Sequence, residues 1–232
     1  MRQIKTLAII TARSGSKRIP RKNIKPFLGR PIIYYPIDVA LNSELFDEVM
    51  VSTDDYEIAD IARKYGASVP FMRSEKTAND FAGTADVLVE VLEEYGKKGI
   101  NPEYCCCIYP TAVFISGGLL KKGFDLLKEK NFDVVFPVAK YNFSIYRALK
   151  LENGKVFPIW KEYYDMRSQD LEPAYHDTGQ FYWFHVDKFM KNKTLMTENT
   201  GAILVSESDF QDIDTEEDWR IAELKYKIVK GL

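Results

Sequence analysis

A short basic loop follows the first apolar run of the chain, and its residues are suited to hold a polyphosphate. Residues 10–23 read ITARSGSKRIPRKN. Gly15 between two serines predicts a tight bend, in which backbone N–H groups can point toward an anion. Basic side chains of this kind stabilise phosphate oxygens and the negative charge that develops when a phosphoryl group is transferred. The loop contains Arg13, Lys17, Arg18, Arg21 and Lys22.

Two other interpretations of this loop stay open on the residues alone: a solvated basic surface and a nucleic-acid contact. The patterns GxxxxGK[ST] and GxGxxG are both absent from the sequence, so neither a P-loop nor a Rossmann cofactor site is predicted. Residues 1–37 contain nine Lys or Arg and no Asp or Glu, whereas the remaining chain has a net charge of −11. Because the basic cluster is compact and lies beside a strand, it favours a small polyphosphate over nucleic acid.

A pair of carboxylates, Asp212 and Asp214, lies near the C-terminal end. In an extended chain, residues i and i+2 point the same way. Both carboxylates can therefore face one Mg²⁺, which prefers one or two carboxylates together with phosphates and waters. An aspartate before a helix is also commonly a cap, and on the residues alone the cap is the more frequent outcome. For Asp54 and Asp55, which follow a predicted strand, a helix cap is favoured over a nucleotide contact.

Strands and amphipathic helices alternate along the chain and would position these groups. Apolar runs predict strands at residues 4–11, 48–53, 104–109, 134–138 and 180–186. Helical periodicity predicts helices at 31–42, 56–65, 84–95 and 119–130, and a last helix capped by Thr215. The alternation predicts one domain over residues 1–232, with a three-layer α/β/α, Rossmann-like architecture around a mostly parallel sheet. The basic loop then lies at the carboxyl end of the first strand, where ligands usually bind.

Residues 140–175 interrupt this alternation. Short strands at 148–151 and 156–159 flank Glu152-Asn153-Gly154, which is typical of a hairpin turn. We interpret this region as an insertion that projects from the sheet and predict that it is a dimer arm.

Composition and cysteine usage are those of a globular protein without a membrane segment. Hydrophobic residues make up 46% of the chain and charged residues 28%, and no stretch approaches the ~20 apolar residues of a membrane span. The first apolar run is too short for a signal peptide, so a cytoplasmic location is expected. The consecutive Cys105, Cys106 and Cys107 are predicted to be buried strand residues and not zinc ligands.

Several segments resemble one known family. IxARxGSKRxxxKN looks like the nucleotide-binding signature of the CTP:sugar-acid cytidylyltransferases, the CMP-sialic acid synthetase family, with Thr11 where proline is usual. The pair Lys22-Asn23 favours the enzymes for nine-carbon acids over those for the eight-carbon acid Kdo. VSTDDYEIADIARKYGA (51–67) resembles the family's second strand and helix, and IYPTAVF (108–114) resembles its QPTSP segment. RSQDLEPAYHDTGQFYWF (167–184) and QDIDTEEDW (211–219) are most similar to the branch that acts on pseudaminic acid.

The resemblance implies a nucleotidyltransferase fold, transfer of CMP from CTP to an acidic nine-carbon sugar, Mg²⁺ as cofactor, and a homodimer. It implies catalytic roles for Arg13, Lys22 and Asp214, and a metal site at Asp212 and Asp214. It implies nucleotide contacts from Ala12, Arg13, Ser16, Lys17, Lys22, Asn23, Thr84, Pro110 and Thr111. It implies sugar contacts from Tyr109, Arg167, Gln169, His176, Asp177, Gln180 and Tyr182.

Other functions stay open at this point. Sialic and legionaminic acids are alternative sugars within the family. A sugar transferase with a DxD metal site is a rival enzyme, although the basic loop counts against it. A non-catalytic nucleotide sensor on the same fold is a rival of another class, although it would not need both aspartates.

Overall fold

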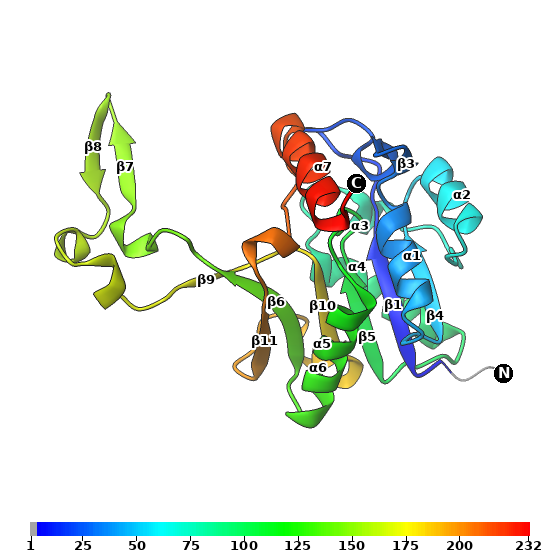
Figure 1. Cartoon of the computed structure of the whole chain (residues 1–232). Helices are drawn as coiled ribbons and strands as arrows, with labels where there is room; N and C mark the ends of the chain where they lie inside the picture. The colour runs from blue at the N-terminus through cyan, green and yellow to red at the C-terminus, as the bar shows by residue number, and fades with distance from the viewer. Residues whose placement is uncertain (1–3) are drawn as a thin grey trace.

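A seven-stranded sheet forms the centre of the structure, a computed structural model that describes residues 4–232 (Figure 1). The strands run in the order β11-β6-β10-β5-β1-β4, and β9 also pairs with β6. Only β9 and β10, among the strands described, run against the others, so the sheet is mostly parallel as predicted. The strand bounds are β1 Thr6–Thr11, β4 Glu48–Ser52, β5 Tyr104–Ile108, β6 Val134–Lys140, β9 Tyr175–Asp177, β10 Phe181–His185 and β11 Thr200–Leu204.

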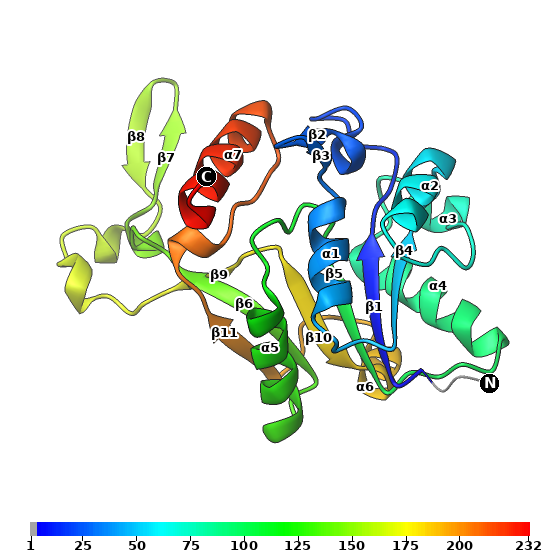
Figure 2. The same ribbon diagram turned by 45° about the vertical axis from the view of Figure 1, so that its right-hand side comes forward.

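Helices cover both faces of this sheet (Figure 2). Alternate side chains of a strand point to opposite faces, and β1 shows this directly. Ala8 and Ile10 pack with one set of helices, while Leu7 and Ile9 pack with the other. The first set is α1 (Tyr34–Asn42), α2 (Tyr56–Lys64) and α5 (Gly117–Glu129), and the second is α4 (Thr84–Lys97) and α6 (Val186–Asn192). The predicted three-layer α/β/α architecture is confirmed.

The C-terminal helix α7 (Glu216–Lys230) packs over the basic loop. Its Trp219 shares a buried cluster with Ile19 of the loop and with Phe27 of the hairpin β2 (Pro26–Phe27) and β3 (Arg30–Pro31). Thr215 accepts a hydrogen bond from the N–H of Asp218 at 3.2 Å, which confirms the predicted cap. Because α7 is anchored to the loop, the residues just before it are brought to the carboxyl end of β1.

One predicted helix begins later in the structure, and some elements were not predicted. The helix expected from Pro31 begins at Tyr34, because Pro31 belongs to the β2–β3 hairpin. The hairpin turns through Leu28 and Gly29, whose φ angles are 46° and 88°. The short helix α3 (Glu75–Ala78), together with α6 and β11, was not predicted. The three cysteines are fully buried and unbridged within β5, as predicted.

Residues 141–174 form an arm that leaves the sheet between β6 and β9 (Figure 1). Its hairpin consists of β7 (Leu149–Glu152) and β8 (Lys155–Pro158). The turn residues Asn153 and Gly154 have φ angles of 50° and 75°, the left-handed pair that this kind of hairpin requires. Apolar side chains on both strands are exposed, including Leu151 at 71% and Val156 at 62%. Its role as a dimer arm stays a prediction. Across residues 4–232, none of the helices has the length and apolar character to cross a bilayer.

Candidate active site

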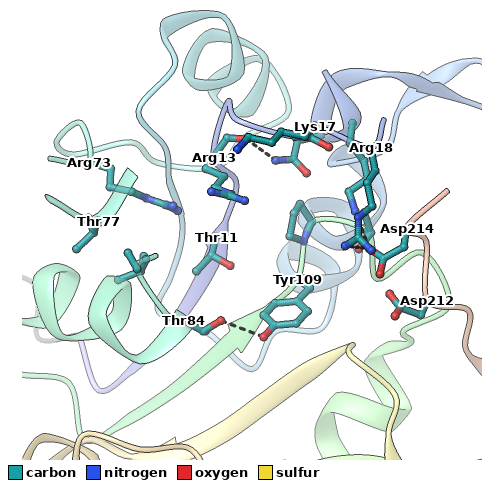
Figure 3. Close-up of a pocket in the computed structure, with 17 residues that line it drawn as sticks. Thr11, Arg13, Lys17, Arg18, Arg73, Thr77, Thr84, Tyr109, Asp212 and Asp214 are labelled. Carbon is teal, nitrogen blue, oxygen red and sulfur yellow. Dashed lines mark hydrogen bonds and ion pairs between the residues drawn. The ribbon is translucent and has the colours of Figure 1, made fainter. Parts of the chain in front are cut away.

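A cavity of about 520 Å³ opens at the carboxyl ends of β1 and β5 (Figure 3). Thr11 ends β1, Tyr109 follows β5, and Thr84 begins α4 on one side of the cavity, while Asp214 precedes α7 on the other. The predicted nucleotide, catalytic and metal residues that line it are Arg13, Ser16, Lys17, Lys22, Asn23, Thr84, Pro110, Thr111, Asp212 and Asp214. Ala12 lies beneath them, fully buried, with its N–H donating to the carbonyl of Ser52 at 2.9 Å.

Hydrogen bonds that the sequence did not predict hold the basic loop in place. Asp54 accepts from the N–H of Ser14 at 2.9 Å and from its hydroxyl at 2.6 Å. The side chain of Asn23 donates to the carbonyl of Arg13 at 2.8 Å. Asp55 caps α2 by accepting from Ile58 N–H at 3.0 Å, as predicted. Asp54 instead braces the loop, so the two neighbouring aspartates have different roles.

The basic side chains pair with carboxylates across the cavity. Arg13 contacts Asp80 at 2.7 Å, and Lys17 pairs with the same carboxylate. These hydrogen bonds from Lys17 and Arg13 lower the pKa of Asp80. On the other side Arg18 contacts Asp214 at 2.7 Å (Figure 3). A bound triphosphate would offer these cations phosphate oxygens in exchange for their carboxylate partners.

Lys22 connects the basic loop to the carboxylate pair. Its ammonium group donates to the carbonyl of Ile213 at 2.7 Å and lies 3.5 Å from the carboxylate of Asp214. Its side chain is only 20% exposed. The arrangement places the Lys22 cation of the basic loop beside the aspartate pair.

The carboxylate pair fits a magnesium ion that is shared with phosphate. Burial raises the pKa of Asp212, and the neighbouring charge of Asp214 raises it further. A divalent cation would relieve this repulsion. Among residues 4–232, no cluster of three or more His, Cys, Asp or Glu side chains is arranged to hold a metal. The protein would thus supply two carboxylates, and phosphates and waters would complete the shell, which is how Mg²⁺ is usually bound.

The other end of the cavity contains residues that were not predicted. Arg73 is 7% exposed and donates to Ser52, at 3.0 Å to its hydroxyl and 2.6 Å to its carbonyl. Burial lowers the pKa of Arg73 to about 10, so it stays a cation at neutral pH. Thr77, Ala82 and Val87 line the same end. The sequence feature that could have identified Arg73 as a candidate is its position as the one charged residue of the mostly apolar segment 67–73.

A second cavity of about 350 Å³ adjoins the first. The two share Thr84 and Tyr109, whose hydroxyls are hydrogen-bonded at 3.0 Å (Figure 3). Tyr182 and Asp177 line the second cavity, and the Tyr182 hydroxyl donates to the Asp177 carboxylate. The rings of Tyr109 and Tyr182 lie 5.6 Å apart. Three of the predicted sugar residues, Tyr109, Asp177 and Tyr182, are thus brought together.

The remaining predicted sugar residues line neither cavity. His176 packs against the rings of Tyr141 and Phe210. Gln180 is 3% exposed and donates to the Thr178 hydroxyl at 3.3 Å. Residues 178–180 bulge between β9 and β10, which pair with the same strand β6. Gln180 is buried in this connection, whereas Tyr182 lines the second cavity.

Arg167 and Gln169 lie on the arm, outside both cavities of their own chain (Figure 1). Both are exposed: Arg167 directly precedes the short helical turn Ser168–Asp170, and Gln169 lies within it. Their neighbours in sequence, residues 175–182, return to the sheet, so the predicted sugar residues separate within one chain, and the sugar contacts of Arg167 and Gln169 stay a prediction. A single chain therefore does not bring all of the predicted sugar residues to one place.

The sequence of the chain is similar to those of enzymes that act on nine-carbon sugar acids. The chain is 37% identical over 226 residues to pseudaminic acid cytidylyltransferase of Campylobacter jejuni, with 97% of each chain covered. It is 32% identical over 229 residues to CMP-N,N'-diacetyllegionaminic acid synthase of Legionella pneumophila, with 95% of each covered.

A solved structure and a family model extend the comparison. CMP:2-keto-3-deoxy-manno-octonic acid synthetase complexed with CTP superposes with a TM-score of 0.71 at 16% identity, covering 98% of this chain and 100% of that one. This likeness confirms the nucleotidyltransferase fold. Residues 7–217 match the family model described as cytidylyltransferase. The chain therefore belongs to the cytidylyltransferase family.

Proposed function

We propose that this chain transfers CMP from CTP to pseudaminic acid and releases pyrophosphate. The observation that carries the proposal is the convergence, in one cavity, of the basic loop, the aspartate pair and a buried arginine. The choice of sugar is supported by the relative from Campylobacter jejuni, at 37% identity over 97% of both chains. The substrate CTP is made inside the cell, so we place the reaction in the cytoplasm.

The first cavity would bind the nucleotide along its length. Arg13, Lys17 and Lys22 would contact the triphosphate, and Ser16 would add a hydroxyl donor. The buried guanidinium of Arg73 would donate to the acceptor edge of the base at the other end. The positive charge at the phosphate end would also stabilise the pyrophosphate as it leaves.

The second cavity would receive the sugar acid. Its apolar residues Phe136, Leu195 and Met196 suit N-acyl methyl groups, and the exposed Lys193 suits the carboxylate. A sugar held beside Tyr109 would present its anomeric hydroxyl to the α-phosphorus in the first cavity. The new P–O bond would form as the bond to the β-phosphate breaks, and most of the rate would come from positioning and charge neutralisation.

Asp212 and Asp214 would hold Mg²⁺ in this arrangement. When bound, the ion would supply charge neutralisation of the phosphate oxygens and acidify the attacking hydroxyl. Lys22, whose ammonium group lies 3.5 Å from Asp214, would then exchange this carboxylate for a phosphate oxygen.

The reaction itself can be tested directly. The protein is incubated with Mg²⁺, each of the four nucleoside triphosphates in turn, and pseudaminic, legionaminic or sialic acid, and pyrophosphate is measured. The expected result is release with CTP and pseudaminic acid above all other pairs. Absence of release with CTP and any of the acids would refute the proposal, while a preference for legionaminic or sialic acid would correct only the sugar.

The arm suggests that the sugar site is completed by a second copy of the chain. Arg167 and Gln169 are exposed on the arm, and the strands of its hairpin carry exposed apolar residues such as Leu151 and Val156. A two-fold dimer would let each arm reach its partner's cavities. In that case Arg167 could meet the carboxylate of a sugar bound to the other chain.

Mixing two inactive variants tests this arrangement. Arg167→Ala and Asp214→Asn are each expected to be inactive alone. If the arm acts on the partner, a randomised mixture contains heterodimers with one intact site, and activity should recover to about one quarter of wild type. Asp214→Asn mixed with Lys22→Ala is the control, because both changes then lie in the body and no intact site forms. Recovery in the control, or none in the test mixture, would contradict an arm that acts in trans.

A further inference from the structure

The nucleotide cavity depends at its base end on a helix too short to be stable by itself. The helix α3 (Glu75–Ala78) has four residues, and a single helical turn does not recover the cost of its own nucleation. Yet Arg73 lies just before it and Thr77 lies within it, and both line the cavity. Thr77 is 4% exposed and Arg73 is 7% exposed, so this segment is packed in place. Contacts from outside the segment must therefore hold it.

One side chain of α4 supplies those contacts. Glu90, in the middle of this 14-residue helix, accepts a hydrogen bond from the N–H of Ser74 at 2.7 Å and another from its hydroxyl at 2.9 Å. It also accepts from the hydroxyl of Thr77. The two carboxylate oxygens thus tie the start and the third residue of α3 to a long, well-packed helix.

The charge of Glu90 matches its surroundings. Burial alone would raise its pKa, but hydrogen bonds from Thr77 and Ser74 and the charge of Arg73 bring the pKa below its ordinary value. The carboxylate in turn favours the charged form of Arg73, together with Asp54. Arg73 is fixed from its other side by the hydrogen bonds to Ser52. Glu90 thereby completes a frame around the arginine without lining the nucleotide cavity itself.

We propose that Glu90 is a positioning residue that fixes the base end of the cavity and so sets the preference for cytosine over uracil. The inference rests on the proposed use of CTP. A guanidinium only donates hydrogen bonds, so Arg73 can satisfy the N3 acceptor of cytosine but opposes the N3–H of uracil. A site of this kind discriminates strongly only while its donors are held in place, because a mispaired polar group is costly when buried.

Glu90→Gln keeps the size of the side chain but replaces one acceptor oxygen with an amide donor. We expect the Kd for CTP, measured calorimetrically in Mg²⁺ buffer, to rise about tenfold, with a comparable fall in the ratio of CTP to UTP affinity. The kcat at saturating CTP should stay within about threefold of wild type, because the reacting groups lie at the other end of the cavity. Glu93→Gln, an exposed change on the same helix, is the matched control and should alter neither quantity.

Thr77→Val, which removes the hydroxyl and keeps the shape, tests the same contact if Glu90→Gln folds poorly. It should weaken CTP discrimination in the same direction, and the double variant should be no worse than the more affected single variant. If the wild-type protein prefers CTP and both Glu90→Gln and Thr77→Val keep that preference, the role of Glu90 is refuted while the proposed function stands. A wild-type protein without preference for CTP would overturn the proposed base choice, and this inference with it.

Discussion

Asp214→Asn is expected to slow CMP transfer by about 100-fold or more at saturating CTP. We propose that this carboxylate holds Mg²⁺, and a bound metal ion stabilises the transition state of such a reaction by several kcal/mol. Asparagine keeps the size of the side chain and one oxygen, but it loses the charge that faces Arg18 and Lys22. The measurement is pyrophosphate release over a range of Mg²⁺ concentrations. The fold should survive, since Ile213 and Trp219 still anchor the loop and α7.

The matched control for this change is Glu217→Gln, which removes an exposed carboxylate in the first turn of α7. It should leave turnover near wild type. If Asp214→Asn keeps near-wild-type turnover with an unchanged Mg²⁺ requirement, the assignment of the metal residues is wrong. A loss confined to thermal stability would point to a structural role of Asp214.

Lys22→Ala is expected to lower kcat/KM for CTP by about 100-fold, because a charge-assisted contact to the leaving phosphate is removed at the cavity. The lysine reaches from the basic loop to the segment of the aspartate pair: it donates to the Ile213 carbonyl at 2.7 Å and lies 3.5 Å from Asp214. Its loss should also affect kcat, since charge builds on the leaving pyrophosphate in the transition state. Steady-state kinetics with CTP varied at fixed sugar would separate the two effects.

Lys25→Ala is the control for Lys22, since Lys25 directly follows the basic loop but pairs with Glu216 and lies over the ring of Trp219. Its removal should change stability more than turnover. If Lys22→Ala altered only the choice among sugars, its triphosphate role would be contradicted.

The family match and the contacts of the aspartate pair favour the proposed enzyme over its two rival functions. A sugar transferase would use the aspartate pair with a nucleotide-sugar donor and release no pyrophosphate. In this chain Asp214 pairs with Arg18 and Lys22 of the basic loop, and the family match covers residues 7–217. A non-catalytic sensor would bind CTP without forming pyrophosphate, so the pyrophosphate assay separates it from the proposed enzyme.

The residues that the sequence predicted well are those whose roles depend on short segments. The apolar runs became the strands β1, β4, β5, β6 and β10 because burial of a strand leaves a continuous hydrophobic pattern. Asp55 and Thr215 cap helices as predicted, because a capping side chain accepts its hydrogen bond from a backbone N–H only three residues further along the chain. The basic loop kept its predicted place because it follows directly from β1.

Only the tertiary structure decided which distant groups meet. Asp54 braces the basic loop from 40 residues away, and Arg73 and Thr77 line the opposite end of the cavity, in a segment that hydrogen bonds tie to Glu90 of α4. Arg167 lies apart from Tyr109, Asp177 and Tyr182 of its own chain because the arm departs from the sheet. The sequence alone was enough for the anion loop and the class of fold, since local spacing and burial determine both. The residues at the two ends of the cavity are brought there by long-range packing. Because they meet through contacts with another helix or strand, their spacing in the sequence does not reveal that they are neighbours.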